Sequence, residues 1–123
     1  RSNIEKLVNE TLSNQSSEYT RKFARISNNN FEFHSEIKIA YEGSKKEADK
    51  INNMTAFFYL QQFIPSNEIK DLFIECDFDY IIFKTQITDK DYNKSMSEKK
   101  ISKKNLLNLN IPFSETELIE ILE

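Results

Sequence analysis

The clearest pattern in the chain is an alternation of apolar and polar residues from Phe31 to Tyr41. A period of two is typical of a strand that buries one face and exposes the other. Ser35 falls on the apolar side, and a β-bulge at this position would account for it. The apolar members are Phe31, Phe33, Ile37, Ile39 and Tyr41, and the polar members are Glu32, His34, Glu36 and Lys38.

The segment before this strand carries apolar residues at helical spacing. Ser2 and Glu5 form a capping box, in which an N-cap serine is followed three residues later by glutamate. A long N-terminal helix is therefore predicted to about Ser27, where a run of three asparagines ends it. A helix broken near Ser16 is the alternative, because short polar side chains compete there for backbone hydrogen bonds. The stripe consists of Ile4, Leu7, Val8, Leu12, Tyr19, Phe23 and Ile26.

A second capping box, from Ser44 to Glu47, starts a helix that Pro65 ends. The second half of this helix is apolar on nearly all sides, which predicts that it is the central core helix. Phe58 belongs to its apolar stripe, so we expect this side chain in the core. The stripe consists of Ala48, Ile51, Met54, Phe57, Phe58, Leu60 and Phe63.

The next segment, Ser66 to Cys76, fits two structures. Its apolar residues fit a helix at positions i, i+3, i+4 and i+7, whereas Leu72, Ile74 and Cys76 also alternate as in a strand. The helix is the preferred interpretation. Phe78 to Ile87 is rich in Tyr, Ile and Phe, which predicts a second strand. Two strands alone are marginally stable in water, so either Ile69–Cys76 supplies a third strand or a partner chain completes the sheet.

The C-terminal third predicts a charged loop over Thr88–Ser95 and a basic helix over Ser97–Leu109. Phe113 to Leu118 forms a third capping box with a hydrophobic staple, which starts a last helix. The predicted fold is α+β: a small antiparallel sheet of two or three strands packed on a buried central helix, with a long N-terminal helix and a C-terminal helical pair. Residues 1–123 form one domain. Because the chain opens at Arg1 rather than Met, we expect a processed chain or a fragment of a larger protein.

Composition removes several classes of site. Gly43 is the only glycine, which excludes phosphate-binding loops that need several glycines. Cys76 and His34 are each single, which excludes an intrachain disulfide and the ordinary Cys- or His-based metal sites. No cofactor and no small-molecule substrate is predicted. No apolar run approaches the roughly 18 residues of a membrane span, so we expect a cytoplasmic, intracellular protein without membrane contact.

Charge suggests nucleic acid as one candidate partner. The net charge is only −3, but the segment Lys84 to Lys104 carries seven lysines against three acids. Lys99, Lys100, Lys103 and Lys104 fall on adjacent positions of the expected helix, where they can follow phosphates. A nucleic-acid-associated protein is therefore the alternative function, and a solvated helix face is the simpler interpretation of the same lysines.

Carboxylates suggest a second alternative, a metal-dependent nuclease. Glu36 and Lys38 have the Glu-x-Lys spacing in which a carboxylate holds Mg²⁺ and a lysine assists the attacking water. Asp77 and Asp79, two residues apart at the start of the next strand, are the candidate further metal ligands. Alternating charge on the wet face of a strand produces the same spacing without any metal.

The preferred function is a non-catalytic module that binds a protein or regulates one. The aromatic residues exceed what two strands bury, aromatic side chains anchor interfaces, and an open sheet edge accepts another strand. Tyr19 and Phe23 on the expected N-terminal helix, and Phe31 and Phe33 on the first strand, are the candidate interface residues. We therefore expect a protein partner or self-association.

Overall fold

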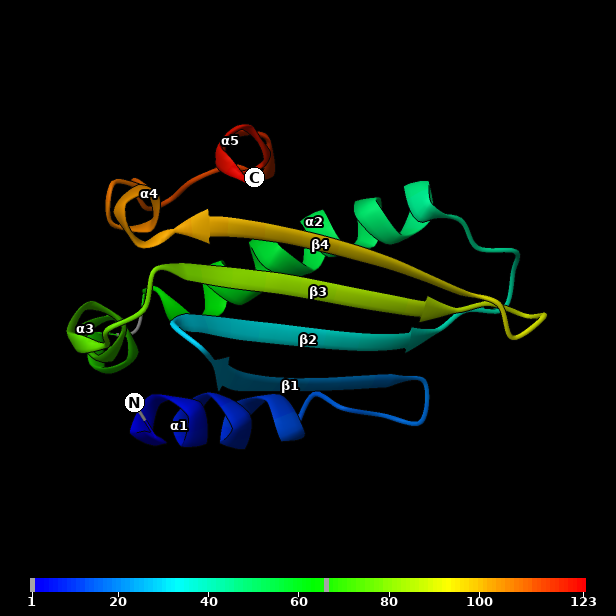
Figure 1. Cartoon of the computed structure of the whole chain (residues 1–123), viewed down its shortest axis with the longest axis horizontal. Coiled ribbons are helices and arrows are strands. Elements are labelled where there is room, and N and C mark those ends of the chain that lie inside the picture. Colours follow the sequence, from blue (N-terminus) through cyan, green and yellow to red (C-terminus); the bar gives the residue numbers. More distant parts are fainter. Residues whose placement is uncertain (1, 66) are drawn as a thin grey trace.

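A computed structural model describes residues 2–65 and 67–123. Within these residues the chain is α+β, with a four-stranded mixed sheet and five helices (Figure 1). The elements are α1 Ser2–Ser13, β1 Thr20–Ser27, β2 Asn30–Lys38, α2 Lys45–Phe63, α3 Asn67–Glu75, β3 Tyr80–Thr88, β4 Lys94–Ser102, α4 Lys103–Leu107 and α5 Glu115–Ile121.

The strands lie in the order in which they occur along the chain, β1-β2-β3-β4. β1 and β2 form an antiparallel hairpin, and so do β3 and β4. β2 and β3 are parallel, so the chain must cross from one end of the sheet to the other through α2 and α3. Ser35 pairs with Lys22 and Thr85 without interruption of the register, so the expected β-bulge is absent at this position.

The predicted sheet of two or three antiparallel strands is wrong in two respects. β1 and β4 were both assigned to helices, and the two strands that were predicted, β2 and β3, run parallel because α2 and α3 connect them. α1 ends at Ser13, and the second half of the expected long helix is β1. Apolar residues on both faces of β1 conceal its period of two: Ala24 points into the core, whereas Phe23 pairs with His34 on the opposite face. The asparagine run forms the turn of the first hairpin, with Asn28 at a φ of 55°.

β4 replaces the first half of the basic helix expected over Ser97–Leu109, and only Lys103–Leu107 is helical, as α4. Only Ser97 and Ile101 of this strand are buried, so the sequence carries almost no apolar alternation. The expected C-terminal helical pair is reduced to the short α4 and to α5. At α5 the third capping box is confirmed, since Ser114 and Glu117 satisfy each other's backbone N–H groups.

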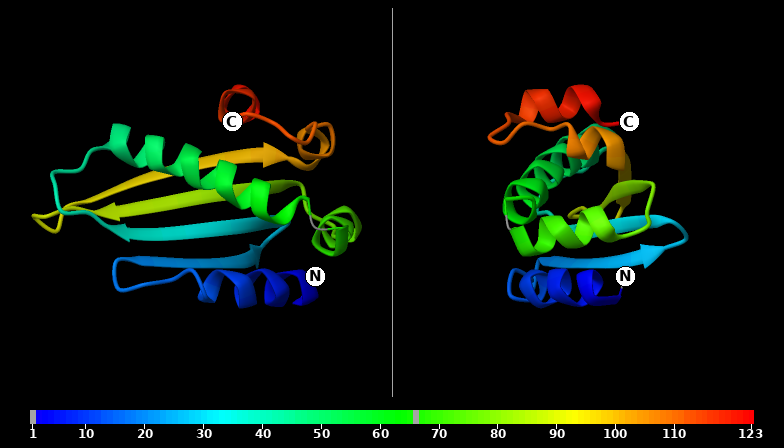
Figure 2. Two further views of the ribbon diagram at one scale, coloured as in Figure 1. Left: turned by 180° about the vertical axis from the view of Figure 1, so that it is seen from behind. Right: turned by 90° about the vertical axis from the view of Figure 1, so that its left-hand side faces the viewer.

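The other helices lie close to their predicted places. α2 is the central helix, and Ser44 caps its N-terminus by accepting a hydrogen bond from the Glu47 N–H. The preferred helix in Ser66–Cys76 is present as α3. α2 crosses one face of the sheet, α1 lies beside β1, and α4 and α5 lie near β4 (Figure 2).

The core lies between α2 and the face of the sheet that carries Phe33. The ring of Phe33 stacks on those of Tyr59, Phe63 and Phe83, with centroids 4.5, 5.8 and 5.6 Å away. Burial raises the pKa of Tyr59 to about 12, so its hydroxyl remains protonated beside the Ser35 Oγ at 2.7 Å. Phe58, expected in the core, is 58% exposed on the outer side of α2.

Polar side chains near the N-terminus close the outer edge of β1. Asn9 donates to the Ala24 carbonyl and accepts from the Ala24 N–H, both at 2.7 Å. Glu5 accepts from the Ile26 N–H, and Ser16 accepts from the Lys22 N–H. Every outward N–H from Lys22 to Ile26 is thereby satisfied. Glu5 thus contacts the strand. The sequence predicts Ser2 as the helix cap, but the structure describes only the backbone of this residue and not its side chain.

Candidate binding face

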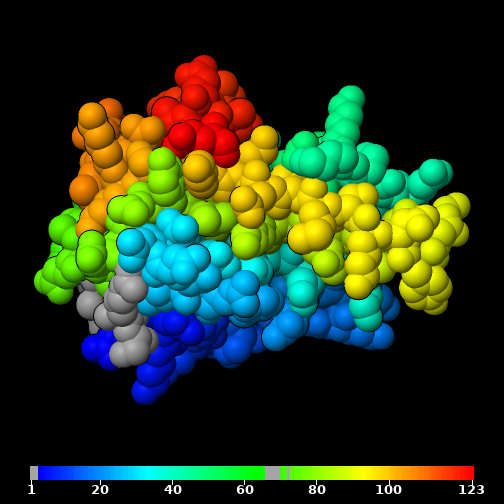
Figure 3. Space-filling view, viewed as in Figure 1, coloured from blue at the N-terminus to red at the C-terminus, as the bar shows by residue number. Residues whose placement is uncertain are grey.

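The face of the sheet opposite α2 carries no described helix, and Figures 1 and 3 look directly onto it. Pairing across the four strands aligns its side chains in rows, such as Arg25, Glu32, Ile82 and Lys100. We call this surface the open face. It is formed by Arg21, Phe23, Arg25, Glu32, His34, Glu36, Lys38, Tyr80, Ile82, Lys84, Gln86, Thr88, Lys94, Met96, Glu98 and Lys100.

The open face is basic although the chain is acidic. It carries six Lys or Arg side chains against three Glu, an excess of three positive charges, while the whole chain has a net charge of −3. The rest of the chain must therefore carry the acidic excess. This separation of charge distinguishes the open face from the rest of the surface. The cations are Arg21, Arg25, Lys38, Lys84, Lys94 and Lys100, and the carboxylates are Glu32, Glu36 and Glu98.

A buried carboxylate holds the middle of the face together. Glu32 is only 5% exposed and lies 3.1 Å from the Arg25 Nε, 2.8 Å from the His34 Nε2 and 3.4 Å from the Lys84 Nζ. Burial acts to raise the pKa of Glu32, but the hydrogen bonds from His34 and Arg25 and the charge of Lys84 lower it below its usual value. Glu32 is therefore ionised at neutral pH and fixes the positions of three neighbouring side chains.

Cations also lie over aromatic rings of this face. The Arg21 guanidinium carbon is 4.4 Å from the centroid of the Phe23 ring, which in turn stacks on His34 at 4.6 Å. At the other end of the face the Lys100 Nζ lies 4.3 Å from the centroid of the Tyr80 ring. Planar groups beside positive charges are the combination that single-stranded nucleic acid contacts in proteins.

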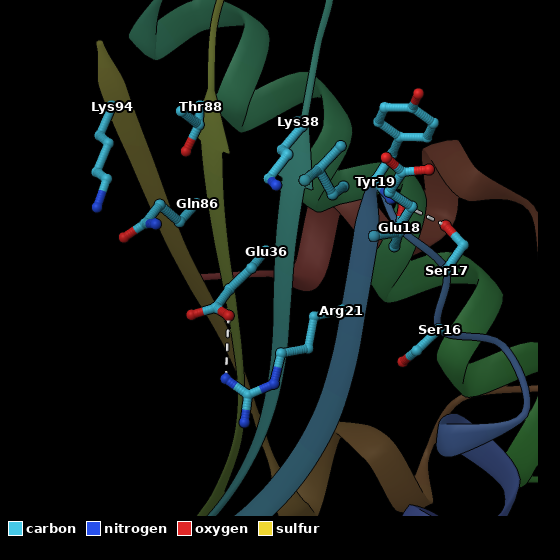
Figure 4. A pocket seen from close by; sticks show the side chains of 12 residues that line it. Ser16, Ser17, Glu18, Tyr19, Arg21, Glu36, Lys38, Gln86, Thr88 and Lys94 are labelled. Atoms are coloured by element: carbon cyan, nitrogen blue, oxygen red, sulfur yellow. Dashed lines mark hydrogen bonds and ion pairs between the residues drawn. The ribbon is translucent and has the colours of Figure 1, made fainter. Parts of the chain in front are cut away.

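A hollow of about 520 Å³ lies at the end of the open face where β1 begins. Arg21, Lys38 and Lys94 line it from three strands, together with the carboxylates of Glu18 and Glu36 (Figure 4). Glu36 accepts from Arg21 at 3.1 Å. Among the described residues no ion pair engages Lys38 or Lys94, so both ammonium groups are free to bind an anion. The other lining residues are Ser16, Ser17, Tyr19, Thr20, Ile37, Gln86 and Thr88.

The four lysines expected to form one nucleic-acid-binding patch are dispersed. Lys100 lies on the open face, whereas Lys99 lies on the opposite face of β4. Lys103 donates to the carbonyls of Ile74 and Cys76 at 2.8 and 2.6 Å and so holds the end of α3. Lys104 is exposed on α4. The strand that replaces the expected helix separates these side chains.

The candidate metal ligands also lie apart. Glu36 pairs with Gln86 on β3, whereas Asp79 precedes the first residue of that strand, seven residues away. At 3.3 Å per residue this separation is on the order of 20 Å. Asp77 precedes Asp79 in the loop between α3 and β3. No group of three His, Cys, Asp or Glu residues that could hold a metal ion occurs among the described residues.

The candidate protein-interface residues divide between core and surface. Phe31 and Phe33 are 1% exposed, so neither is an interface residue of the folded chain. Tyr19 is 62% exposed beside the hollow, and Phe23 lies on the open face. Sequence reasoning missed the open face because Arg21 and Arg25, expected on a helix, lie on its β1.

No family profile, curated protein or solved structure matches this chain. Among the helices of the described residues, none is both long enough and apolar enough to cross a membrane.

Proposed function

We propose that this chain is a non-catalytic binding module that holds single-stranded nucleic acid on its open face. The observation that carries the proposal is the basic charge of this face in an acidic chain. A strand of nucleic acid laid across the four β-strands would meet cations from each of them. Neutralising phosphates releases counterions, which supplies most of the affinity of sequence-independent binding.

The aromatic groups support a single strand rather than a duplex. Unpaired bases expose flat surfaces that stack on aromatic rings and on guanidinium groups, whereas a duplex conceals them. The Arg21 guanidinium on Phe23 and the Tyr80 ring under Lys100 supply two such positions on the open face. The hollow with Lys38 and Lys94 accommodates a phosphate at one end of this path.

The test is fluorescence anisotropy with labelled 12-nucleotide poly(U) RNA and poly(dT) DNA over a series of salt concentrations. We expect log Kobs to fall with log salt at a slope of about −0.7 for each phosphate neutralised. The double variant Lys38→Ala and Lys100→Ala should weaken binding at least tenfold and reduce the slope by about 1.4.

The matched control replaces two exposed lysines of α2, Lys46→Ala and Lys50→Ala. This variant removes the same charge from the chain but leaves the open face intact, so it should bind like the wild type. Absence of binding at 50 mM salt, or equal losses in both double variants, would contradict the proposal.

A second candidate is the protein-binding module that the sequence predicts. Met54 and Phe58 lie one turn apart on α2 and are 41% and 58% exposed, and the Phe58 ring lies 6.0 Å from that of Phe57. Aromatic and methionine side chains at such positions are typical of interface cores. Mass spectrometry of crosslinked, co-purifying proteins tests it: a specific partner should be lost from Phe58→Ser but retained by Tyr92→Ser, which removes another exposed ring.

A further inference from the structure

The two outer edges of the sheet, on β1 and β4, differ in how their outward backbone groups are hydrogen-bonded. Side chains of the N-terminal segment accept hydrogen bonds from the outward N–H groups of Lys22, Ala24 and Ile26 on β1. On β4 the outward groups belong to the even-numbered residues, because Lys100 exchanges both backbone hydrogen bonds with Glu123 on that side, at 3.0 and 2.8 Å. No other described residue pairs with this edge, so the N–H and C=O groups of Lys94, Met96 and Glu98 remain available.

The available part of β4 is accessible to another strand. A hollow of about 370 Å³ lies along it, lined by Lys45, Lys84, Met96, Ser97 and Glu98. Met96 is 58% exposed. In Figure 1 this half of β4 extends away from α5, which lies near the other half.

The sequence of this edge is complementary to itself. It reads Lys-Ser-Met-Ser-Glu from Lys94 to Glu98, with a cation at one end, a carboxylate at the other and Met96 in the centre. In an antiparallel pair of two such strands centred on Met96, each Lys94 lies opposite the Glu98 of the other copy. Ser95 lies opposite Ser97, and the two Met96 side chains meet.

We infer that β4 pairs with β4 of a second copy of this chain, antiparallel and centred on Met96. The three outward residues of each copy then form hydrogen-bonded pairs, with about six backbone hydrogen bonds between the chains. The pair has a two-fold axis, so one patch serves both copies. In this register Lys94 lies opposite Glu98 at both ends of the paired segment. An unrelated strand would need a carboxylate and a cation at the same spacing, so the charges favour a second copy of this chain as the occupant.

This pairing goes beyond the proposed function and does not depend on it. The two-fold axis is perpendicular to the sheet, because antiparallel neighbours in one sheet present matching faces on the same side. The two open faces would therefore form one continuous surface on an eight-stranded sheet. The interface is small, so we expect weak and reversible association rather than an obligate dimer.

The test is sedimentation velocity from about 1 to 500 µM protein in low salt. We expect the mass to rise from 14.6 kDa towards twice this value as concentration increases. The variant Met96→Pro removes an outward N–H without breaking the ladder to β3, and proline is tolerated at such edge positions. It should weaken association at least tenfold and leave the circular dichroism spectrum unchanged.

A charge exchange tests the register. Lys94→Glu and Glu98→Lys each place like charges opposite each other and should weaken association about tenfold. The double variant restores opposite charges and should return to within about threefold of the wild type. A strict monomer at 500 µM, or wild-type association of Met96→Pro, would overturn the inference. A double variant as weak as the single ones would overturn the register.

Discussion

Glu32 shows how one residue organises the open face. A carboxylate with 5% exposure is costly to bury unless it is paired, and Glu32 has three partners. Arg25, His34 and Lys84 lie on β1, β2 and β3, so the charge of Glu32 ties three strands together. It also reduces the positive charge at the centre of the face and leaves the free cations towards its ends.

Replacing Glu32 with glutamine should destabilise the protein in a pH-dependent way. At pH 7 we expect Glu32→Gln to cost about 1–3 kcal/mol, because hydrogen bonds to a charged group are lost. The pKa of Glu32 is lowered in the folded state, so its contribution is present above the ordinary value of 4.5 and is lost as pH falls through the folded pKa. Urea denaturation at pH 7 and pH 3 measures the difference, which should shrink towards zero at the lower pH. A difference independent of pH would contradict the assigned charge.

The acid sensitivity of the chain has further sources. The pKa of Asp89 is lowered first by the hydrogen bond from the Gly43 N–H, and that of Asp49 is lowered first by Lys45. Both carboxylates contribute with the same sign as Glu32. The Glu32→Gln variant should therefore still lose stability in acid, with a smaller slope than the wild type.

At the scale of elements, α1 acts as a substitute for a fifth strand beside β1. Asn9 supplies the donor and the acceptor that a neighbouring backbone would supply to Ala24. Exposed edges invite pairing with other chains, and covering them is a common protection.

The variant Asn9→Ala should open this edge. We expect a loss of about 1–3 kcal/mol, because the Ala24 N–H and C=O lose their partners. Static light scattering should also show slow aggregation near the unfolding midpoint. Asn14→Ala, which removes an exposed hydrogen bond to Glu10 at the end of the same helix, is the control and should lose much less.

Within α2, replacing two phenylalanines should change the free energy of unfolding by different amounts. Phe63 is 2% exposed and Phe58 is 58% exposed. Phe63→Ala should cost about 3–5 kcal/mol in urea denaturation, whereas Phe58→Ala should cost less than about 1 kcal/mol. Equal costs would mean that the outer side of α2 is covered in solution.

These elements also show what the sequence could and could not predict. β2 was predictable because one of its faces is apolar and the other charged. α2 and α5 were predictable from their caps. β1 was not predictable, because Phe23 lies on the face that points away from the core and so hides the alternation. β4 was not predictable, because one of its buried residues is the polar Ser97, whose hydroxyl accepts a hydrogen bond from Asn52. The open face depends on both strands, so it could not be assembled from the sequence, although Lys84 and Lys94 lay in the predicted basic segment.

At the scale of the whole molecule, one sheet and one core join the two ends of the chain. The buried cluster includes Ile4 of α1 and Leu118 of α5, so unfolding either end removes core contacts from the rest. We expect one cooperative transition in urea, with coincident curves from far-UV circular dichroism and tyrosine fluorescence. Separate transitions for the two probes would show that the terminal helices unfold independently.

The closed edge of β1 has a consequence for the size of any assembly. A growing filament needs two reactive ends on every subunit, as a polymer needs a bifunctional monomer. Because α1 covers the edge of β1, each chain has one edge available for strand pairing, that of β4. A pairing through β4 would occupy this edge. After two copies have paired, no free edge would remain for a third. The sheet could therefore double in size but could not grow into a filament.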